Sequence, residues 1–249
     1  MEIIDLSNKT IIVTGAASGI GRETAIVASK VGAKVVILDL SEEGLRVTMS
    51  LLEGGGHSVH VIDLCDTGSI APLIKTIAEQ HGMIDGVVHC AGISSRKPLN
   101  VLSKNGFSKV MDINFYSFVE LVRQTTKKKY FSDGGSIVVM SSISSIKGYK
   151  AKTEYCVSKA AVDSFVRCMA AELAYRKIRV NSVMAAEVLT PLALKARETN
   201  AAVGASDFSA PLGPSDPYEV ANTICFLLSN ATKTITGTSL LIDGGACIQ

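Results

Sequence analysis

The stretch Thr10-Ile11-Ile12-Val13-Thr14-Gly15-Ala16-Ala17-Ser18-Gly19-Ile20-Gly21 joins an apolar, β-branched run directly to a glycine-rich turn. The residues that follow, Arg22 to Val31, have helical spacing. Gly15 permits a tight turn, Gly19 lets the backbone approach a pyrophosphate, and Gly21 lets the helix pack on the strand. Because a helix N-terminus attracts phosphate, this order of strand, turn and helix predicts a dinucleotide-binding site.

The same alternation of apolar run and helical segment continues along the rest of the chain. Alternation of this kind is typical of strand–helix–strand units that build a parallel sheet. We therefore expect a single α/β domain over residues 1–249, with a Rossmann-type, doubly wound, seven-stranded parallel sheet and helices on both faces. The predicted strands are Thr10–Thr14, Lys34–Leu38, Ser58–Ile62, Gly86–His89, Ser136–Met140, Arg179–Val183 and Ser239–Ile242.

Capping residues mark several of the expected helices. Ser41 can cap a helix that ends before Gly54-Gly55-Gly56, and Asp216-Pro217 can open another that runs to Leu228. Long helices are predicted over Leu99–Thr126 and Thr153–Tyr175. The stretch from about 187 to 214 breaks the rhythm with three prolines, and we interpret it as a mobile substrate lid, with a plain surface insertion as the alternative.

Composition narrows the function class. The formal net charge is +2, from 25 basic and 23 acidic residues, so no strong field would gather nucleic acid or an anionic membrane. Six scattered cysteines form no C-x-x-C pair, and we expect neither a metal site nor a disulfide framework. No signal-like N-terminus and no apolar stretch of about 18 residues occurs. The sequence predicts a soluble, cytoplasmic protein that acts on a small molecule.

Asp39 follows the second predicted strand, 18 residues after Gly21, where a carboxylate can accept hydrogen bonds from the adenosine ribose. A carboxylate there repels a 2′-phosphate, so NAD is favoured over NADP. Arg22 is the nearby basic residue, and we expect it to face solvent. Asp63 closes the third strand, where it can accept a hydrogen bond from the adenine amino group or cap the next helix.

Tyr155 and Lys159 stand at positions i and i+4 of a predicted helix and therefore share one face. Tyrosine has a pKa near ~10, so as an acid or base at neutral pH it needs a nearby positive charge. Ser141-Ser142 follows the fifth strand at the edge where open parallel sheets bind ligands, although either serine could be a turn residue. Asn114 is expected to be buried, where it could simply tie helix to sheet.

Together these motifs resemble the short-chain dehydrogenase/reductase family over essentially the whole length, and the chain is similar to its 3-oxoacyl-(acyl-carrier-protein) reductase-like members. The resemblance also includes Asn181, Thr190 and Ile242-Asp243-Gly244-Gly245. It implies catalytic Asn114, Ser142, Tyr155 and Lys159: Tyr155 as general acid/base, Lys159 lowering its pKa and binding the nicotinamide ribose, Ser142 orienting the substrate oxygen, and Asn114 holding a relay water. The implied cofactor-binding residues are Gly15, Ser18, Gly19, Ile20, Gly21, Asp39, Leu40, Asp63, Leu64, Cys90, Ala91, Gly92, Tyr155, Lys159, Val188 and Thr190.

The chain departs from the family pattern in three places. His89-Cys90-Ala91-Gly92 replaces the usual Asn-Asn-Ala-Gly, Ala185-Ala186 replaces Pro-Gly, and Glu187 stands at the expected mouth of the site. We expect Cys90 to be a buried small residue rather than a reactive thiol.

The resemblance leaves the substrate open. It implies NAD-linked oxidation of a secondary alcohol, polyol, sugar or steroid. The alternative is a 3-oxoacyl-(acyl-carrier-protein) reductase, with basic residues at Lys127–Lys129 and Arg176 for an acidic carrier. Outside the enzymes, a nucleotide-binding regulatory scaffold is the competing class. Family members suggest a homotetramer built as a dimer of dimers.

Overall fold

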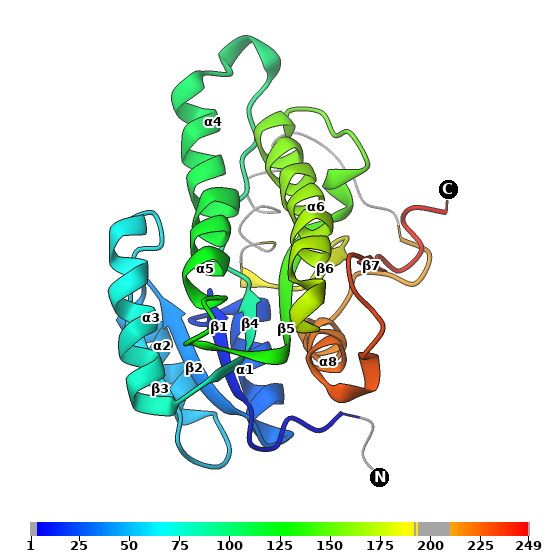
Figure 1. The fold of residues 1–249 in the computed structure, drawn as a ribbon. Helices are drawn as coiled ribbons and strands as arrows, with labels where there is room; N and C mark the ends of the chain where they lie inside the picture. The colour runs from blue at the N-terminus through cyan, green and yellow to red at the C-terminus, as the bar shows by residue number, and fades with distance from the viewer. Residues whose placement is uncertain (1–3, 192, 194–209, 249) are drawn as a thin grey trace.

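In the computed structural model, which describes residues 4–191, 193 and 210–248, seven parallel strands form one sheet in the order β3-β2-β1-β4-β5-β6-β7 (Figure 1). This confirms the predicted Rossmann-type fold. The strands are continuous β-branched runs because both faces of the sheet are covered by helices. Their bounds are β1 Thr10–Thr14, β2 Lys34–Asp39, β3 Ser58–Val61, β4 Ile84–His89, β5 Phe131–Ser142, β6 Arg179–Ala185 and β7 Ser239–Ile242.

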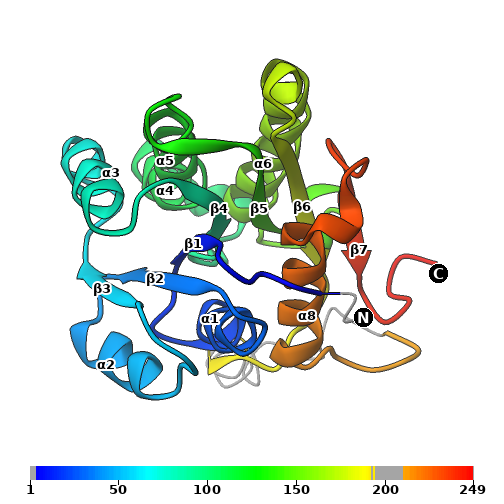
Figure 2. The same ribbon diagram turned by 60° about the horizontal axis from the view of Figure 1, so that its bottom comes forward.

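Helices cover the two faces in separate layers, as Figure 2 shows. One layer holds α1 (Gly19–Lys30), α2 (Glu42–Ser50) and α8 (Pro217–Leu228). The other holds α3 (Thr67–His81), α5 (Ser117–Thr125) and α6 (Thr153–Leu173). Each layer buries its own cluster of aliphatic side chains against the sheet. The two clusters fix the sheet rigidly and leave its carboxyl edge for the site.

The expected caps form where the sequence indicates them. The Ser41 side chain accepts a hydrogen bond from Gly44 N at the start of α2. At α8, Asp216 and Glu219 form a reciprocal capping box, with Pro217 in the first turn.

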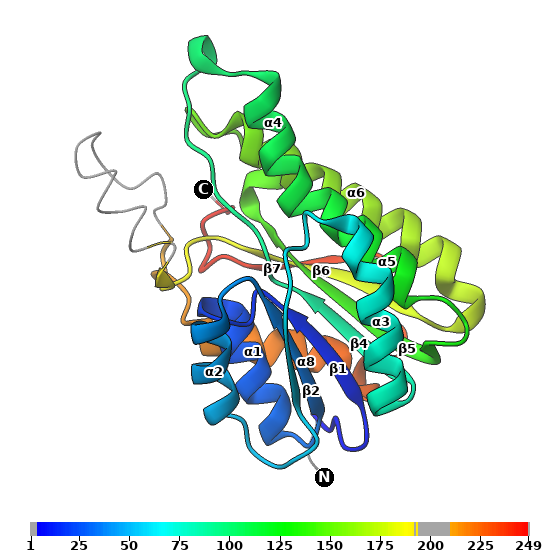
Figure 3. The same cartoon turned by 90° about the vertical axis from the view of Figure 1, so that its left-hand side faces the viewer.

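The continuous helix predicted over Leu99–Thr126 is wrong. The segment consists of a short 3₁₀ turn η1 (Leu99–Val101), α4 (Lys104–Met111), a π-helical turn η2 (Asp112–Tyr116) and α5. Ser103 starts α4 afresh, because its side chain accepts a hydrogen bond from Gly106 N. A π turn inside a helix is rare and often marks a functional site. Figure 3 shows α4 and the start of α6 projecting beyond the carboxyl ends of the strands.

Most of the predicted lid lies outside the described residues, which omit 192 and 194–209. The backbone at the two ends of that stretch is joined by an isolated parallel bridge between Val188 and Ser215. Leu189 N donates to Ser215 O at 3.0 Å, and Ser215 N donates to Glu187 O at 2.9 Å. Over the part of the chain that is described, no helix combines the length and apolarity needed to span a bilayer.

Candidate active site

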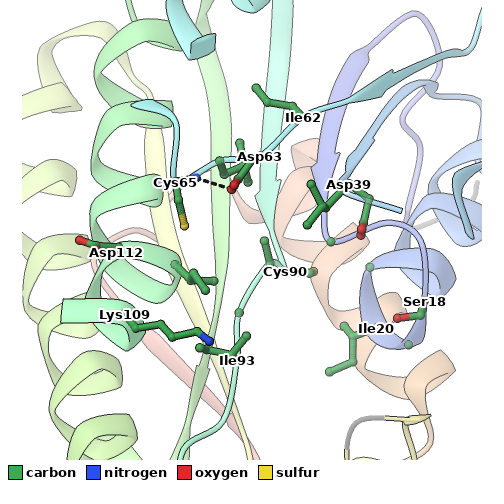
Figure 4. A pocket seen from close by; sticks show the side chains of 18 of the residues that line it. Ser18, Ile20, Asp39, Ile62, Asp63, Cys65, Cys90, Ile93, Lys109 and Asp112 are labelled. Carbon is green, nitrogen blue, oxygen red and sulfur yellow. Dashed lines mark hydrogen bonds between the residues drawn. The ribbon is translucent and has the colours of Figure 1, made fainter. Parts of the chain in front are cut away.

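A cavity of about 820 Å³ opens at the carboxyl ends of β1 and β4, where the chain order in the sheet reverses (Figure 4). Open α/β sheets bind ligands at this switch point, and the volume falls within the range of small-molecule sites. The glycine turn and the ends of β2, β3 and β4 form one part of its wall, and α4 forms the facing part. The cavity therefore offers room for an extended ligand across the sheet edge.

The glycine turn is packed so closely that side chains are excluded. Gly15 has φ +66°, and a Cβ there would lie 2.7 Å from Ala91 N. A Cβ on Gly21 would lie 2.2 Å from Gly15 O, because α1 starts directly against the turn. The first turn of α1 carries no acidic residue, and the Ser18 side chain forms no capping hydrogen bond. The N-terminus of α1 is thus open toward the cavity and suited to a phosphate group.

Replacing Gly21 with alanine should lower the free energy of unfolding by about 1–3 kcal/mol and weaken NADH binding, because the added methyl group overlaps backbone that cannot rotate away. Thermal unfolding and an NADH titration would measure both effects. Gly55→Ala is the matched control, since a Cβ at Gly55 meets nothing within 4 Å. Equal behaviour of the two variants would contradict the close packing described for the turn.

Asp39 ends β2 and points into the cavity beside Leu40 (Figure 4). Ala17 N donates to its Oδ2 at 3.0 Å, and Ser41 N donates to its Oδ1 at 3.0 Å. These bonds hold the carboxylate at the adenosine end and leave further lone pairs for a ligand hydroxyl.

The expectation that Arg22 faces solvent is wrong. The Arg22 side chain is half-buried, and its Nε donates to Thr48 Oγ1 at 3.0 Å. Its Nη2 donates to the carbonyl oxygens of Ala17 and Gly44. The guanidinium therefore links α1 to α2. Its hydrogen bonds go to Thr48 and to two backbone carbonyl oxygens.

Asp63 and Cys90 also line the cavity. Cys65 N donates to Asp63 Oδ1 at 2.9 Å, whereas α3 starts at Thr67 and its N-cap, Asp66, makes no side-chain capping hydrogen bond. Asp63 therefore does not cap that helix and stays available on the cavity wall. Burial raises the pKa of Cys90 to about 12, so its thiol stays protonated, in line with a small packing residue.

The unusual His89 still supports the backbone next to the cavity. His89 is buried, and Thr14 Oγ1 lies 3.0 Å from its Nδ1. Ala91 N donates to the same hydroxyl at 3.3 Å. Burial and then the charge of Lys159 lower the pKa of His89 to about 3, so the ring is neutral. His89 stands where the family motif usually has asparagine. Together with Thr14 it holds the backbone of Ala91.

Tyr155 and Lys159 lie one helical turn apart near the start of α6. Lys159 Nζ is 5.7 Å from the Tyr155 ring centroid and donates to Met140 O at 2.9 Å. Burial outweighs the opposing effect of a hydrogen bond with Ser142 and raises the pKa of Tyr155 to about 12. Burial also lowers the pKa of Lys159 to about 8. At neutral pH the phenol of the ligand-free protein is therefore neutral, and Lys159 stays mostly protonated but loses its proton more easily than an exposed lysine.

The two serines at the end of β5 have different partners. Ser141 Oγ donates to Asp163 Oδ2 at 2.9 Å, and this buried carboxylate also accepts from Ser182 Oγ at 2.7 Å. Ser142 instead caps the short turn η3 (Ile143–Ser145), accepting from Ser144 N at 3.1 Å, and bonds to Tyr155. The structure thus brings Ser142 to the tyrosine and assigns Ser141 to packing.

Asn114 is fully buried in the π turn η2. Its Oδ1 accepts from Ile93 N at 2.8 Å, and its Nδ2 donates to Ile93 O and to Ser158 Oγ, each at 3.0 Å. A Cβ on Gly92 would lie 3.2 Å from Asn114 Oδ1 and 3.7 Å from Lys159 Nζ. The amide and the ammonium therefore converge on Gly92 at the inner end of the cavity.

Most of the predicted cofactor residues line this one cavity. Val188, Tyr155 and Lys159 are not among its lining residues. Val188 lies in the bridge to Ser215, and a Cβ on Gly92, which does line the cavity, would lie 3.7 Å from Lys159 Nζ. No sequence motif indicates the wall opposite the glycine turn, which α4 and η2 supply. The additional lining residues are Ile62, Cys65, Ile93, Asn105, Ser108, Lys109, Asp112, Ile113 and Pro191.

Known proteins resemble this chain from end to end. A family model described as enoyl-(acyl carrier protein) reductase matches residues 15–247. The 3-oxoacyl-(acyl-carrier-protein) reductase of Thermotoga maritima is 33% identical, covering 98% of this chain and 99% of its own length. An NAD-dependent glycerol dehydrogenase of Listeria innocua is 30% identical over 98% and 96%. A glucose/ribitol-type short-chain dehydrogenase/reductase of Brucella melitensis superposes with a TM-score of 0.90 at 27% identity, covering 99% of both chains.

Proposed function

Because the chain belongs to the short-chain dehydrogenase/reductase family, we propose that it transfers a hydride between NAD and a secondary alcohol or its carbonyl product, with Tyr155 as general acid and base. The family acts on alcohol and carbonyl substrates, and we assign this protein to polyols, sugars, steroids or related secondary alcohols. The observation that supports the proposal is that Lys159 Nζ lies 5.7 Å from the Tyr155 ring centroid and also next to Gly92 on the wall of the cavity.

The described residues fit a dinucleotide. A Cβ would fill the cradle at Gly15 and Gly21, and the open N-terminus of α1 suits a pyrophosphate. Asp39 suits the adenosine ribose, and Asp63 suits the adenine amino group. Thr190 lines the cavity at the end where the carboxamide would lie.

Hydride transfer is the chemistry that a bound nicotinamide supplies, and the chain provides orientation and a proton. During reduction, the Tyr155 hydroxyl gives its proton to the substrate oxygen, while Ser142 donates a hydrogen bond to that oxygen. During oxidation, Tyr155 must accept a proton as phenolate, which the positive charge of Lys159 stabilises. Asn114 holds the backbone at Ile93 and leaves one lone pair of Oδ1 toward Gly92, where a relay water could donate.

We propose NAD rather than NADP on the charge of Asp39. A 2′-phosphate on the ribose would meet this carboxylate, and the Arg22 guanidinium that could neutralise it is turned toward α2. The NAD dependence named for the Listeria innocua relative supports this assignment.

Replacing Asp39 with asparagine should shift the ratio of NADPH to NADH affinity by about 10- to 100-fold toward NADPH, because the repulsion of the 2′-phosphate is removed. Fluorescence titrations with both nucleotides would measure the two Kd values. Asp66→Asn is the control, since Asp66 is exposed and lies outside the cavity lining. An unchanged ratio in the Asp39 variant would assign cofactor preference to another residue.

Parallel titrations of the wild type with NADH and NADPH, followed by a panel of alcohols and carbonyls with the better cofactor, test the proposed function directly. We expect submillimolar NADH binding and turnover of at least one secondary alcohol or ketone. A protein that binds neither nucleotide would overturn the proposal.

The 3-oxoacyl-(acyl-carrier-protein) reductase activity remains the second candidate because of the Thermotoga maritima relative. The basic residues weighed for carrier docking do not act together, however. Arg176 is buried, and its guanidinium bonds to Asp133, Thr126 O and Phe131 O. Lys127–Lys129 alone stay exposed for an acidic partner. A 3-oxoacyl thioester in the substrate panel distinguishes the two activities.

We also propose that residues 1–249 act as one catalytic domain and assemble as a dimer of dimers. The surfaces of α4, α5 and α6 on one side of the sheet could pair across a two-fold axis. Light scattering that gives a monomer mass would overturn the tetramer.

A further inference from the structure

We propose that Lys109 is a cofactor-binding residue that contacts the diphosphate of the dinucleotide from the wall opposite the glycine turn. This inference rests on the proposed function, since it needs a dinucleotide in the cavity. Lys109 lies in the last turn of α4, in a part of the wall that no motif in the sequence indicates.

The Lys109 side chain lies across the cavity from the glycine turn. Figure 4 shows its side chain extending across the floor of the cavity toward Ile93, with Ser18 and Ile20 on the facing wall. Ser18 and Ile20 belong to the turn and first residues of α1, where the phosphates would lie. Asp39 and Asp63 stand at the other end of the same view, where the adenosine would lie. The ammonium group is therefore level with the diphosphate and not with the adenine.

The charges of the lining residues favour Lys109 as the partner of the phosphates. Among the described residues that line it, Lys109 is the one basic side chain, whereas Asp39, Asp63 and Asp112 are acidic. A diphosphate brings two more negative charges. The Arg22 guanidinium is bonded to Thr48 and to backbone carbonyls, and Lys159 Nζ is held by Met140 O at the inner end. Lys109 is consequently the cation placed to offset the charge of the phosphates.

The Lys109 ammonium group is available to bind a ligand. Lys109 is exposed, and within the described part of the chain its side chain forms neither an ion pair nor a hydrogen bond. Asp112 stands three residues further along, but its carboxylate points away from the Lys109 ammonium group in Figure 4. The long, flexible lysine stem can reach a phosphate oxygen without moving the helix. Charge-assisted bonds of this kind are stronger than neutral ones.

Binding measurements with NADH, ADP and adenosine separate this role from others, because ADP carries a diphosphate and adenosine carries none. Lys109→Ala should weaken ADP and NADH binding by about three- to tenfold and leave adenosine binding within about twofold. Lys109→Arg should retain the affinity, and Lys109→Glu should weaken ADP further. Added salt should weaken ADP binding to the wild type more than to Lys109→Ala.

Lys104→Ala is the matched control, because Lys104 is exposed on the same helix but does not line the cavity. Equal losses for ADP and adenosine would place Lys109 against the nucleoside and overturn the proposal. Unchanged ADP binding in Lys109→Ala would also overturn it, and would indicate that Asp112 engages the lysine in solution. In both cases the wild type still binds NADH, so the proposed function stands. A wild type that binds neither ADP nor NADH overturns both.

Discussion

Replacing Tyr155 with phenylalanine should lower kcat by about three orders of magnitude and leave the Kd for NADH within about twofold of the wild type. The phenylalanine ring fills the same space but has no proton to give to the substrate oxygen. Without the hydroxyl, Ser142 can still bond to that oxygen, but no described group is placed to complete the proton transfer. Steady-state rates on the best substrate of the panel, with NADH titrations of each variant, measure both quantities.

Tyr175→Phe is the control for this change. Tyr175 follows α6 in the short turn η4 (Ala174–Arg176), and 82% of its surface is exposed. Its loss should leave kcat and the Kd for NADH unchanged. If Tyr155→Phe kept its turnover within about tenfold, another group would supply the proton and Tyr155 would have a structural role. A protein with no turnover in either form, but with intact NADH binding, would instead fit the regulatory scaffold.

Replacing Lys159 with methionine should abolish turnover and at the same time raise the stability of the cofactor-free protein by about 1–2 kcal/mol near pH ~7. Burial lowers the Lys159 pKa from its usual 10.5 to about 8. The charged ammonium is thus disfavoured in the folded state relative to the unfolded state. The loss of the bond to Met140 O offsets part of the gain.

The stability gained by Lys159→Met should depend on pH. Because the folded pKa lies below the unfolded one, the cost of the buried charge is fully present below about pH 8. It is relieved as the pH rises from there toward 10.5, where Lys159 is neutral in both states. Thermal unfolding should therefore show a gain for Lys159→Met near pH ~7 that shrinks near pH ~10.

Lys128→Met is the control for the stability measurement, since Lys128 is exposed and should give neither a gain nor a trend with pH. A Lys159 variant that is less stable than the wild type at both pH values would show that the ammonium group supports the fold. Lost turnover together with increased stability would indicate that Lys159 serves catalysis. Lost stability would indicate that it supports the fold.

The fold could be predicted from the sequence almost completely, and for a simple reason. A parallel strand buried on both faces must be a continuous apolar run, and each of the seven runs became a strand within two residues of its predicted bounds, except that β5 starts five residues earlier. The prediction of one helix over Leu99–Thr126 was wrong, because helical spacing continues smoothly through Ser103 and through the π turn. The helix cap at Ser103 and the wider hydrogen-bond ring of the π turn hardly change the spacing of apolar residues along the sequence.

The site was predictable where chemistry depends on neighbours in sequence. The glycine turn, Asp39 and the pair Tyr155/Lys159 follow from strand ends and helix spacing. The first two line the cavity, and Lys159 Nζ lies 5.7 Å from the Tyr155 ring centroid, while their roles stay predictions. The orientation of Arg22 was not predictable, because its partners come from α2. Lys109 was also missed, since a cavity wall made by α4 depends on packing between distant elements. The available signal was that Lys109 stands four residues before Ile113 and five before Asn114.

The π turn at Asp112–Tyr116 has a consequence for the rotational phase of its two neighbouring helices. Each residue of an α-helix advances the side-chain direction by about 100°, so the wider ring at η2 offsets α4 from α5. This offset lets Phe118 and Leu121 point into the core while Asn105 and Lys109 point into the cavity. Deleting one residue here to restore a plain α-helix would turn α4 by about 100° and remove its polar face from the cavity.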